Sequence, residues 1–109
     1  MQFKTTRVFA RAYKRLKKKY RKLENDIASL RKLLSENPSA GISLGSGLFK
    51  IRLASSDLVK GKSGGFRVVY YFMFAANTIV LLDLYTKSER EDVPISEIRK
   101  ILDDFLRTT

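Results

Sequence analysis

Residues 66–85 of this chain read FRVVYYFMFAANTIVLLDLY. Two runs rich in Val, Ile, Tyr and Phe, Phe66–Ala75 and Thr78–Tyr85, flank the dipeptide Ala76-Asn77. β-Branched and aromatic residues favour extended strands, and an Asn between two such runs is typical of a turn. The stretch therefore predicts a hairpin of two central antiparallel strands, around which we expect the fold to be built.

The segments on either side of the hairpin predict a third strand, two loops and a closing helix. Residues 49–54 read FKIRLA, in which apolar and polar side chains alternate as in a strand with one buried face. The Gly- and Ser-rich segments 37–47 and 55–65 predict loops. Apolar residues recur at helical spacing over residues 95–106, directly after Pro94, which predicts a C-terminal helix.

The N-terminal third predicts helix. Residues 7–37 contain no Gly or Pro, and their apolar residues recur at spacings of three and four. A single rod of about 30 residues would be roughly 45 Å long, which is longer than a domain of this size is wide. Like-charged pairs weaken the stretch Lys18–Lys22, and Asn25 or Asp26 is a candidate cap for a second helix. We therefore expect a helical hairpin with its break at Lys18–Lys22; a coiled-coil dimer arm over residues 9–34 is the alternative.

The order of elements is a short strand or coil, two helices, three antiparallel strands and a helix. This order predicts one α+β domain over residues 1–109, with the helical hairpin and the C-terminal helix packed on one face of a small antiparallel sheet. The length of 109 residues suits one domain. Because the chain has no apolar run of about 18 residues and no signal-peptide pattern, we expect a cytoplasmic protein without a membrane partner.

Charge and composition restrict the chemistry. The chain has 22 Lys and Arg against 11 Asp and Glu, a net charge of +11 that attracts polyanions. The basic residues are densest over Lys14–Lys22, which includes the RNA-binding candidates Lys17, Lys18 and Lys19. The absence of His and Cys excludes thiolate nucleophiles, disulfides and the commonest proton shuttle, and no metal or cofactor is expected. Catalysis would have to use Lys, Arg, Tyr, Ser, Thr or carboxylates.

Further cations lie beside the predicted strands. If the strands are neighbours, Lys50, Arg52 and Arg67 should leave the same open face of the sheet. Such a face is polar in any case, but like charges gathered together cost energy unless an anion compensates them, which favours an anion-binding surface. The glycine-rich segment 60–65 is either a phosphate-cradling loop or a simple tight turn. The other basic residues near the strand ends are Lys60, Lys62, Lys87 and Arg90.

Three blocks of the sequence resemble the core of the RelE superfamily of bacterial toxins, particularly its HigB-like branch. They are residues 49–54 (FKIRLA), 61–71 (GKSGGFRVVYY) and 81–92 (LLDLYTKSERED). The order of elements and the basic helical stretch are similar too, so the resemblance covers nearly the whole chain. It implies the toxin of a type II toxin-antitoxin pair, an mRNA interferase that cuts mRNA in the ribosomal A site and inhibits translation. The implied partners are the ribosome, mRNA and a cognate antitoxin protein.

The resemblance also implies a chemistry and residues that perform it. The ribose 2′-hydroxyl attacks the adjacent phosphate and leaves a 2′,3′-cyclic phosphate, with Lys, Arg and Tyr in place of a His pair. Lys50 and Arg52 match paired basic residues with a general-base or charge-stabilising role. Arg67 matches an arginine suited to bidentate phosphate contact, and Lys87 matches a basic residue after the last strand. We expect RNA to be bound by Lys60, Lys62, Arg90, Lys17, Lys18 and Lys19.

Two departures from the family pattern leave roles open. Ser88 stands where many RelE proteins have a second arginine, and Pro94 stands where they have a tyrosine. The candidates for stacking on a base and protonating the leaving group are therefore Lys62, Tyr85 and Arg90. Two other functions are compatible with the sequence: a ParE-like inhibitor of DNA gyrase with the same fold, and a non-catalytic module that binds RNA or the ribosome.

Overall fold

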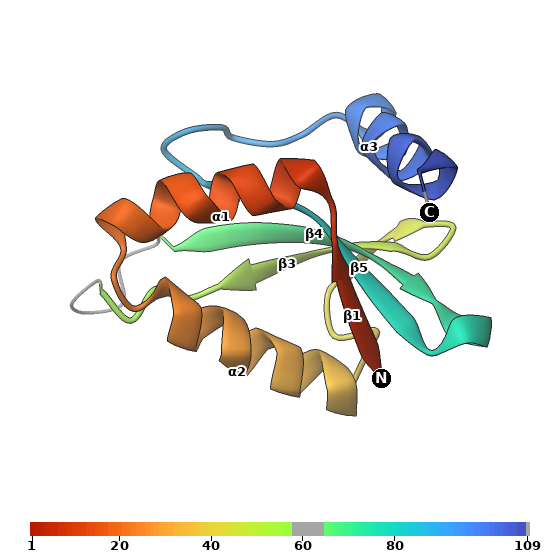
Figure 1. The fold of residues 1–109 in the computed structure, drawn as a ribbon, viewed down its shortest axis with the longest axis horizontal. Coiled ribbons are helices and arrows are strands. Elements are labelled where there is room, and N and C mark those ends of the chain that lie inside the picture. Colours follow the sequence, from red (N-terminus) through yellow and green to blue (C-terminus); the bar gives the residue numbers. More distant parts are fainter. Residues whose placement is uncertain (58–64, 109) are drawn as a thin grey trace.

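The computed structural model describes residues 1–57 and 65–108. Its elements are β1 (Gln2–Thr5), α1 (Arg7–Lys19), α2 (Leu23–Glu36), β2 (Ile42–Gly45), β3 (Leu48–Leu53), β4 (Phe66–Met73), the short 3-10 turn η1 (Phe74–Ala76), β5 (Thr78–Thr86) and α3 (Ile95–Arg107). The strands form one sheet in the order β1-β5-β4-β3-β2 (Figure 1). The predicted α+β class is confirmed: two N-terminal helices, a five-stranded, mostly antiparallel sheet and a C-terminal helix. Within the described residues, no helix has both the length and the apolar character to cross a membrane.

The predicted hairpin is formed by β4 and β5 and lies at the centre of the sheet. β4 ends at Met73 instead of the predicted Ala75, because the chain turns through η1. The turn ends at Asn77, whose φ of 48° lies in the left-handed region that Asn visits more readily than most residues. The pairing has one register shift, between Val69 and Tyr70. The hairpin prediction is therefore confirmed.

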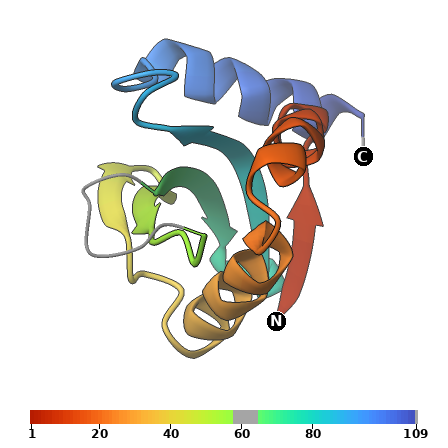
Figure 2. The same ribbon diagram turned by 90° about the vertical axis from the view of Figure 1, so that its left-hand side faces the viewer.

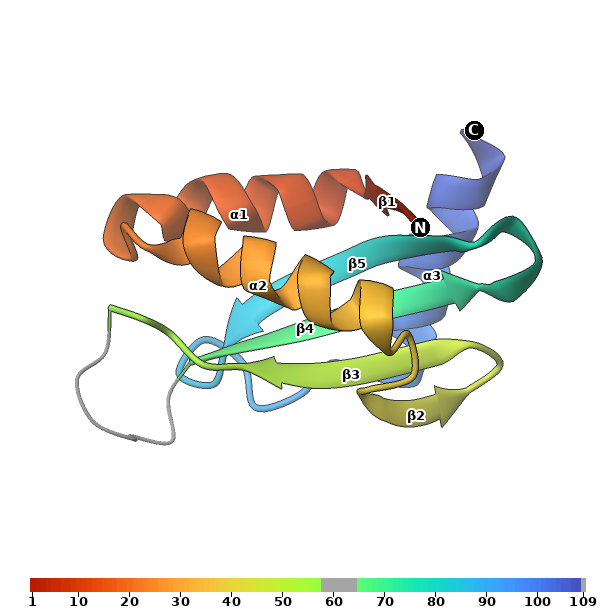
Figure 3. The same ribbon diagram turned by 90° about the horizontal axis from the view of Figure 1, so that it is seen from below.

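Two short edge strands extend the sheet beyond the predicted three. Ile42–Gly45 lies inside the predicted loop 37–47 but pairs with β3 as β2, so this part of the loop prediction is wrong. A strand of four residues flanked by Gly and Ser carries little local signal, and pairing with β3 decides its conformation. At the other edge β1 pairs with β5 in parallel, so the expectation of an antiparallel sheet is wrong for this pair (Figure 3).

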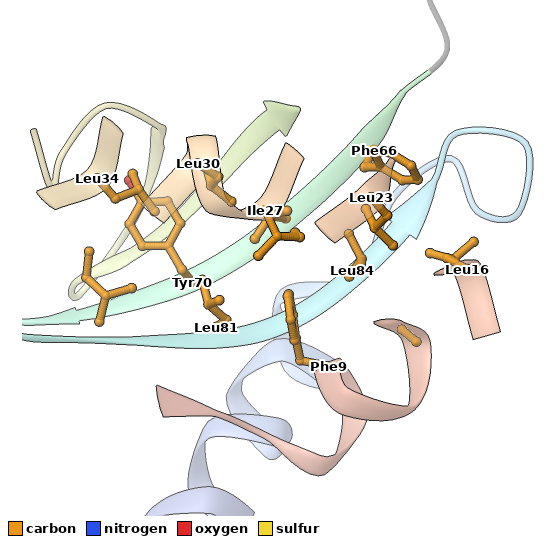
Figure 4. Packing of buried hydrophobic residues seen from close by; sticks show 13 residues of the cluster. Phe9, Leu16, Leu23, Ile27, Leu30, Leu34, Phe66, Tyr70, Leu81 and Leu84 are labelled. Carbon is orange, nitrogen blue, oxygen red and sulfur yellow. The ribbon is translucent and has the colours of Figure 1, made fainter. Parts of the chain in front are cut away.

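The helical stretch is broken where the sequence predicts it. α1 ends at Lys19 and α2 begins at Leu23, which confirms the helical hairpin. The apolar faces of both helices are buried in one cluster with residues of β4 and β5, including Phe66 and Tyr70 (Figure 4). A coiled-coil arm would need the same apolar stripe for a second chain, so that alternative is wrong.

The capping of α2 differs from the prediction. The backbone N–H of Lys22 donates to Oδ2 of Asp57 at 2.9 Å, and Asp57 lies beyond β3. Asp26 is buried inside α2 and accepts hydrogen bonds from the backbone N–H and the hydroxyl of Ser56. Asn25 gives no capping hydrogen bond. The two carboxylates thus fasten the turn between the helices to the segment that follows β3.

α3 lies on the opposite face of the sheet from α1 and α2, so the expectation that all helices share one face is wrong (Figure 2). The reason lies in β5, whose residues are all buried. Leu81 and Leu84 join the cluster with α1 and α2, whereas Val80 and Leu82 join the cluster with α3. A strand that is apolar on both faces needs a layer of structure on each side.

Candidate functional site

The register of β3, β4 and β5 places predicted cations on one face of the sheet. Arg52 lies opposite Arg67, and Arg67 lies opposite Tyr85. Residues directly opposite each other in an antiparallel pair point to the same side, so these three form a row across three strands. Lys50, two positions before Arg52, points to that side as well. The shared face that the alternation predicted is therefore present.

This face belongs to the α3 side of the sheet, and α3 covers only part of it. Leu48 and Val69, on the same side as Lys50, are buried in the cluster with α3. Figure 2 shows α3 over β5, with no helix over β3 on this side. Arg52 is exposed there, and Lys50 is half-buried. The cations thus occupy the part of the face that helices leave accessible.

Arg67 is a half-buried cation with an unsatisfied donor. Its Nη1 is buried and has no hydrogen-bond partner among the described residues. A buried polar group without a partner costs about 1–3 kcal/mol, and a charged group costs more. The exposed guanidinium of Arg52 lies opposite and adds a second positive charge. A bound phosphate would supply acceptors to both arginines and reduce their mutual repulsion.

An acidic residue that the sequence analysis did not single out also belongs to this group. Asp92, in the segment between β5 and α3, accepts a hydrogen bond from Nζ of Lys50 at 3.0 Å at its Oδ1. The Lys50 ammonium holds the pKa of this carboxyl below its usual value, with help from the backbone N–H of Val93. One acid in a charged turn has no distinguishing spacing; only the fold brings it to a lysine 42 positions away. We call Lys50, Arg52, Arg67, Tyr85 and Asp92 the sheet-face site.

Tyr85 contributes a protonated hydroxyl to the sheet-face site. Burial, followed by the negative charge of Asp92, raises the pKa of the Tyr85 phenol to about 12, against a smaller opposing effect of Arg67. Its hydroxyl donates to Oδ1 of Asp92 at 3.4 Å, a long contact. At neutral pH the phenol is therefore protonated and able to donate to an oxyanion. Of the two candidates for the acid role that lie among the described residues, Tyr85 is the one that pairs opposite Arg67.

The other two candidates lie elsewhere. Lys62 falls outside the described residues, as does Lys60. The guanidinium of Arg90 is held by both carboxylate oxygens of Glu97, at 2.8 and 3.1 Å. It lines a cavity of about 630 Å³ between α1, β5 and α3, where a second ion pair joins Arg15 to Glu89 at 2.8 Å. The positive charge of Arg90 is thus balanced within the fold.

The remaining predicted residues lie around the site. Lys87 is exposed on the turn that follows β5, next to Thr86, which pairs with the first residue of β4. It therefore lies at the end of the sheet that carries Arg67. Lys17, Lys18 and Lys19 form the last turn of α1, where positive charge is favourable to the helix dipole. They lie on the helical layer of the opposite face and do not join the sheet-face site (Figure 2).

The last residues of β5 have no strand beside them on the β1 side, and acidic side chains accept hydrogen bonds from their backbone there. β1 pairs with β5 only as far as Leu81. Beyond that point the backbone N–H of Leu84 donates to Oδ1 of Asp83 at 2.7 Å, and that of Thr86 donates to Oε1 of Glu89 at 2.9 Å. Burial raises the pKa of the Asp83 carboxyl. These carboxylates satisfy donors that a further strand would otherwise take, a recognised way of blunting a sheet edge.

No protein-family model matches the sequence.

Proposed function

We propose that this protein is an endoribonuclease that cuts mRNA on the ribosome, the toxin of a type II toxin-antitoxin pair with a RelE-like fold. The observation that carries the proposal is the row of Arg52, Arg67 and Tyr85 on one face of the sheet, which runs from the exposed Arg52 through the half-buried Arg67 to the buried Tyr85. Two guanidinium groups lie beside a protonated phenol, and one of them has a donor without a partner among residues 1–57 and 65–108. This combination supplies phosphate contacts, charge stabilisation and a proton donor to a chain without histidine.

The side chains support defined roles in the proposed reaction. The ribose 2′-hydroxyl gives its proton to solvent water, its oxygen forms a bond to the adjacent phosphorus, and the bond from phosphorus to the 5′-oxygen of the next nucleotide breaks. Arg52 and Arg67 stabilise the charge that develops on the phosphate oxygens. Tyr85 donates a proton to the departing 5′-oxygen. Lys50 is paired with Asp92 as an ammonium, which favours its charge-stabilising role over its general-base role.

α1 supports a second, separate contact with RNA. Residues 7–22 include nine basic residues and no acidic one. Of these nine, only Arg15 and Lys17 form ion pairs within the described part of the chain, with Glu89 and Glu24 respectively. The other cations lie on α1 and in the turn after it, and those on the helix repel one another without an ion-pair partner among the described residues. We propose that they contact ribosomal RNA through its phosphates, independently of sequence.

The test is cleavage by the purified full chain in a reconstituted translation system, with the cut sites mapped by primer extension. We expect cleavage of translated mRNA and products with a 2′,3′-cyclic phosphate. Arg52→Ala and Arg67→Ala should each slow cleavage about 100-fold or more. Arg99→Ala removes the same charge from an exposed position on α3 and should leave cleavage unchanged. Equal activity of all three variants would contradict the proposal.

The same preparation separates the other functions. Inhibition of gyrase supercoiling without a cut transcript would support a ParE-like poison. Salt-dependent RNA binding without a cut transcript would support a non-catalytic module. Expression of the chain alone should arrest growth, and coexpression of its cognate antitoxin should relieve the arrest.

A further inference from the structure

Asp92 gathers three hydrogen-bond donors at a single oxygen. Its Oδ1 accepts from Nζ of Lys50 at 3.0 Å, from the hydroxyl of Tyr85 at 3.4 Å and from the backbone N–H of Val93 at 2.9 Å. Lys50 comes from β3 and Tyr85 from β5, with β4 between them. The carboxylate of Asp92 therefore contacts groups on the two outer strands of the sheet-face site, β3 and β5.

The carboxylate is held in place by its own backbone. Val93 is buried in the cluster on the α3 side, and Pro94, directly after it, is the N-cap of α3. The Val93 N–H bond orients Oδ1 towards the sheet. The side chain of Asp92 is nevertheless 63% exposed, so the acid remains accessible at the surface of the site. Asp92 is thus an anchored residue whose carboxylate faces both the site and solvent.

The charge of Asp92 has opposing effects in a site that binds phosphate. It attracts the Lys50 ammonium and accepts the Tyr85 hydroxyl, which places both groups. The negative charge of Asp92 also repels a phosphate bound in the sheet-face site, because like charges close together interact unfavourably. A residue kept only to strengthen RNA binding would not be an acid. The position of Asp92 therefore favours a role in arranging the reacting groups.

We propose that Asp92 is a positioning residue, which holds the Lys50 ammonium and the Tyr85 hydroxyl in register beside the phosphate to be cut. This inference rests on the proposed nuclease function and adds a residue to its site. It assigns Lys50 and Tyr85 to one unit, because both depend on the same carboxylate oxygen. Its consequence is that loss of the carboxylate should improve RNA binding and impair cleavage.

The experiment compares Asp92→Asn with Asp103→Asn. Asp103 is exposed on α3, and its substitution makes the same change in net charge away from the site. Binding is measured by fluorescence anisotropy with an RNA whose ribose at the cleavage position is 2′-deoxy, so that it binds without being cut. Cleavage is measured under single-turnover conditions on ribosomes. Thermal unfolding of each variant reports whether the fold is retained.

We expect Asp92→Asn to bind the uncleavable RNA up to about fivefold more tightly, because one negative charge is lost near the phosphate. Its cleavage should be at least about tenfold slower, because a small misplacement of reacting groups has large effects on rate. Asp103→Asn should change neither. Cleavage by Asp92→Asn at the wild-type rate would overturn the proposal. Parallel losses of binding, cleavage and thermal stability would overturn it too, because they indicate a purely structural role.

A readout without cleavage separates this inference from the proposed function. NMR of protein that carries carbon-13-labelled tyrosine follows the ionisation of the Tyr85 phenol. The Tyr85 signal is assigned as the one that is missing from the spectrum of Tyr85→Phe. Asp92→Asn should move the ionisation of Tyr85 to lower pH, and Asp103→Asn should not. If the wild-type protein cuts no RNA but this shift and the tighter binding occur, the nuclease proposal fails and the arrangement by Asp92 is upheld. Absence of both the shift and the tighter binding overturns the role of Asp92 whether or not RNA is cut.

Discussion

Arg52 and Arg67 lie directly opposite each other on β3 and β4, so two guanidinium groups share one side of the sheet. Like charges in this arrangement destabilise an antiparallel pair. The nearest negative charge in the sheet-face site, Asp92, is paired with Lys50 and bonded by Tyr85. The fold therefore retains an unfavourable pair of charges where the proposed substrate would bring a phosphate.

Replacement of one arginine should stabilise the protein while it removes function. Arg52→Thr ends the repulsion from Arg67 and introduces a residue with high β propensity. We expect the free energy of unfolding to rise by about 0.2–1 kcal/mol in urea titrations. RNA affinity and cleavage should fall in the same variant. A loss of stability would show that Arg52 contributes contacts that offset the repulsion.

Tyr85→Phe tests the proposed proton donor. The ring is buried and should keep its packing, so thermal stability should change little. Cleavage should fall about 100-fold if the hydroxyl protonates the leaving oxygen. Because the pKa of Tyr85 is raised to about 12, nearly all of the phenol is protonated up to about pH 10. The pH-rate profile of the wild-type protein should therefore show no loss from this group below about pH 10.

Asp83→Asn tests the pH dependence of stability. Burial raises the pKa of the Asp83 carboxyl in the folded state, so folding favours its protonated form. The cost of the ionised form is absent below the unfolded pKa, about 3.9, and is fully present above the folded pKa. The asparagine oxygen can still accept the N–H of Leu84. We expect Asp83→Asn to raise Tm at pH 7 by up to about 4–8 °C, with the difference vanishing near pH 3 in calorimetry.

The positive surface of α1 predicts a salt-dependent contact. Arg11, Lys14 and Lys18 are exposed and have no ion-pair partner within the described residues. Arg11→Gln, Lys14→Gln and Lys18→Gln together should make the slope of log binding constant against log salt concentration shallower by up to about two to three. Each phosphate contact contributes about 0.7–0.9 to this slope. Helix stability should not fall, because the substitutions remove like-charged neighbours. An unchanged salt slope would remove α1 from the proposed RNA contact.

Asp57→Ala tests the distant cap of α2. The substitution removes the carboxylate that accepts the Lys22 N–H, one of the unpaired donors at the start of the helix. We expect a loss of about 1 kcal/mol in the free energy of unfolding, the usual effect of losing a cap. Asn25→Ala is the matched control, because Asn25 makes no capping bond, and it should have a smaller effect. Equal losses would indicate that Asp57 does not cap α2.

Local patterns predicted the elements that depend on their own residues. The hairpin of β4 and β5 and the break between α1 and α2 follow from composition, apolar spacing and charge along the chain. The alternation of residues 49–54 also predicted the common face of Lys50, Arg52 and Arg67, because side-chain direction in a strand has a period of two. By contrast, the short strand β2 and the parallel pairing of β1 with β5 were missed, since edge strands of four residues are stabilised by their neighbours.

The sequence by itself determined the fold class, the concentration of cations near residue 20 and the small set of side chains available for acid-base chemistry. Only the tertiary structure decided the side of the sheet on which α3 packs and the partners of the site. Asp92 and Lys50 meet across 42 positions of sequence, and Arg90 is paired with Glu97 on α3. These outcomes depend on sheet register and on competition between charges brought together by folding. Periodicity along one segment carries no information about such contacts.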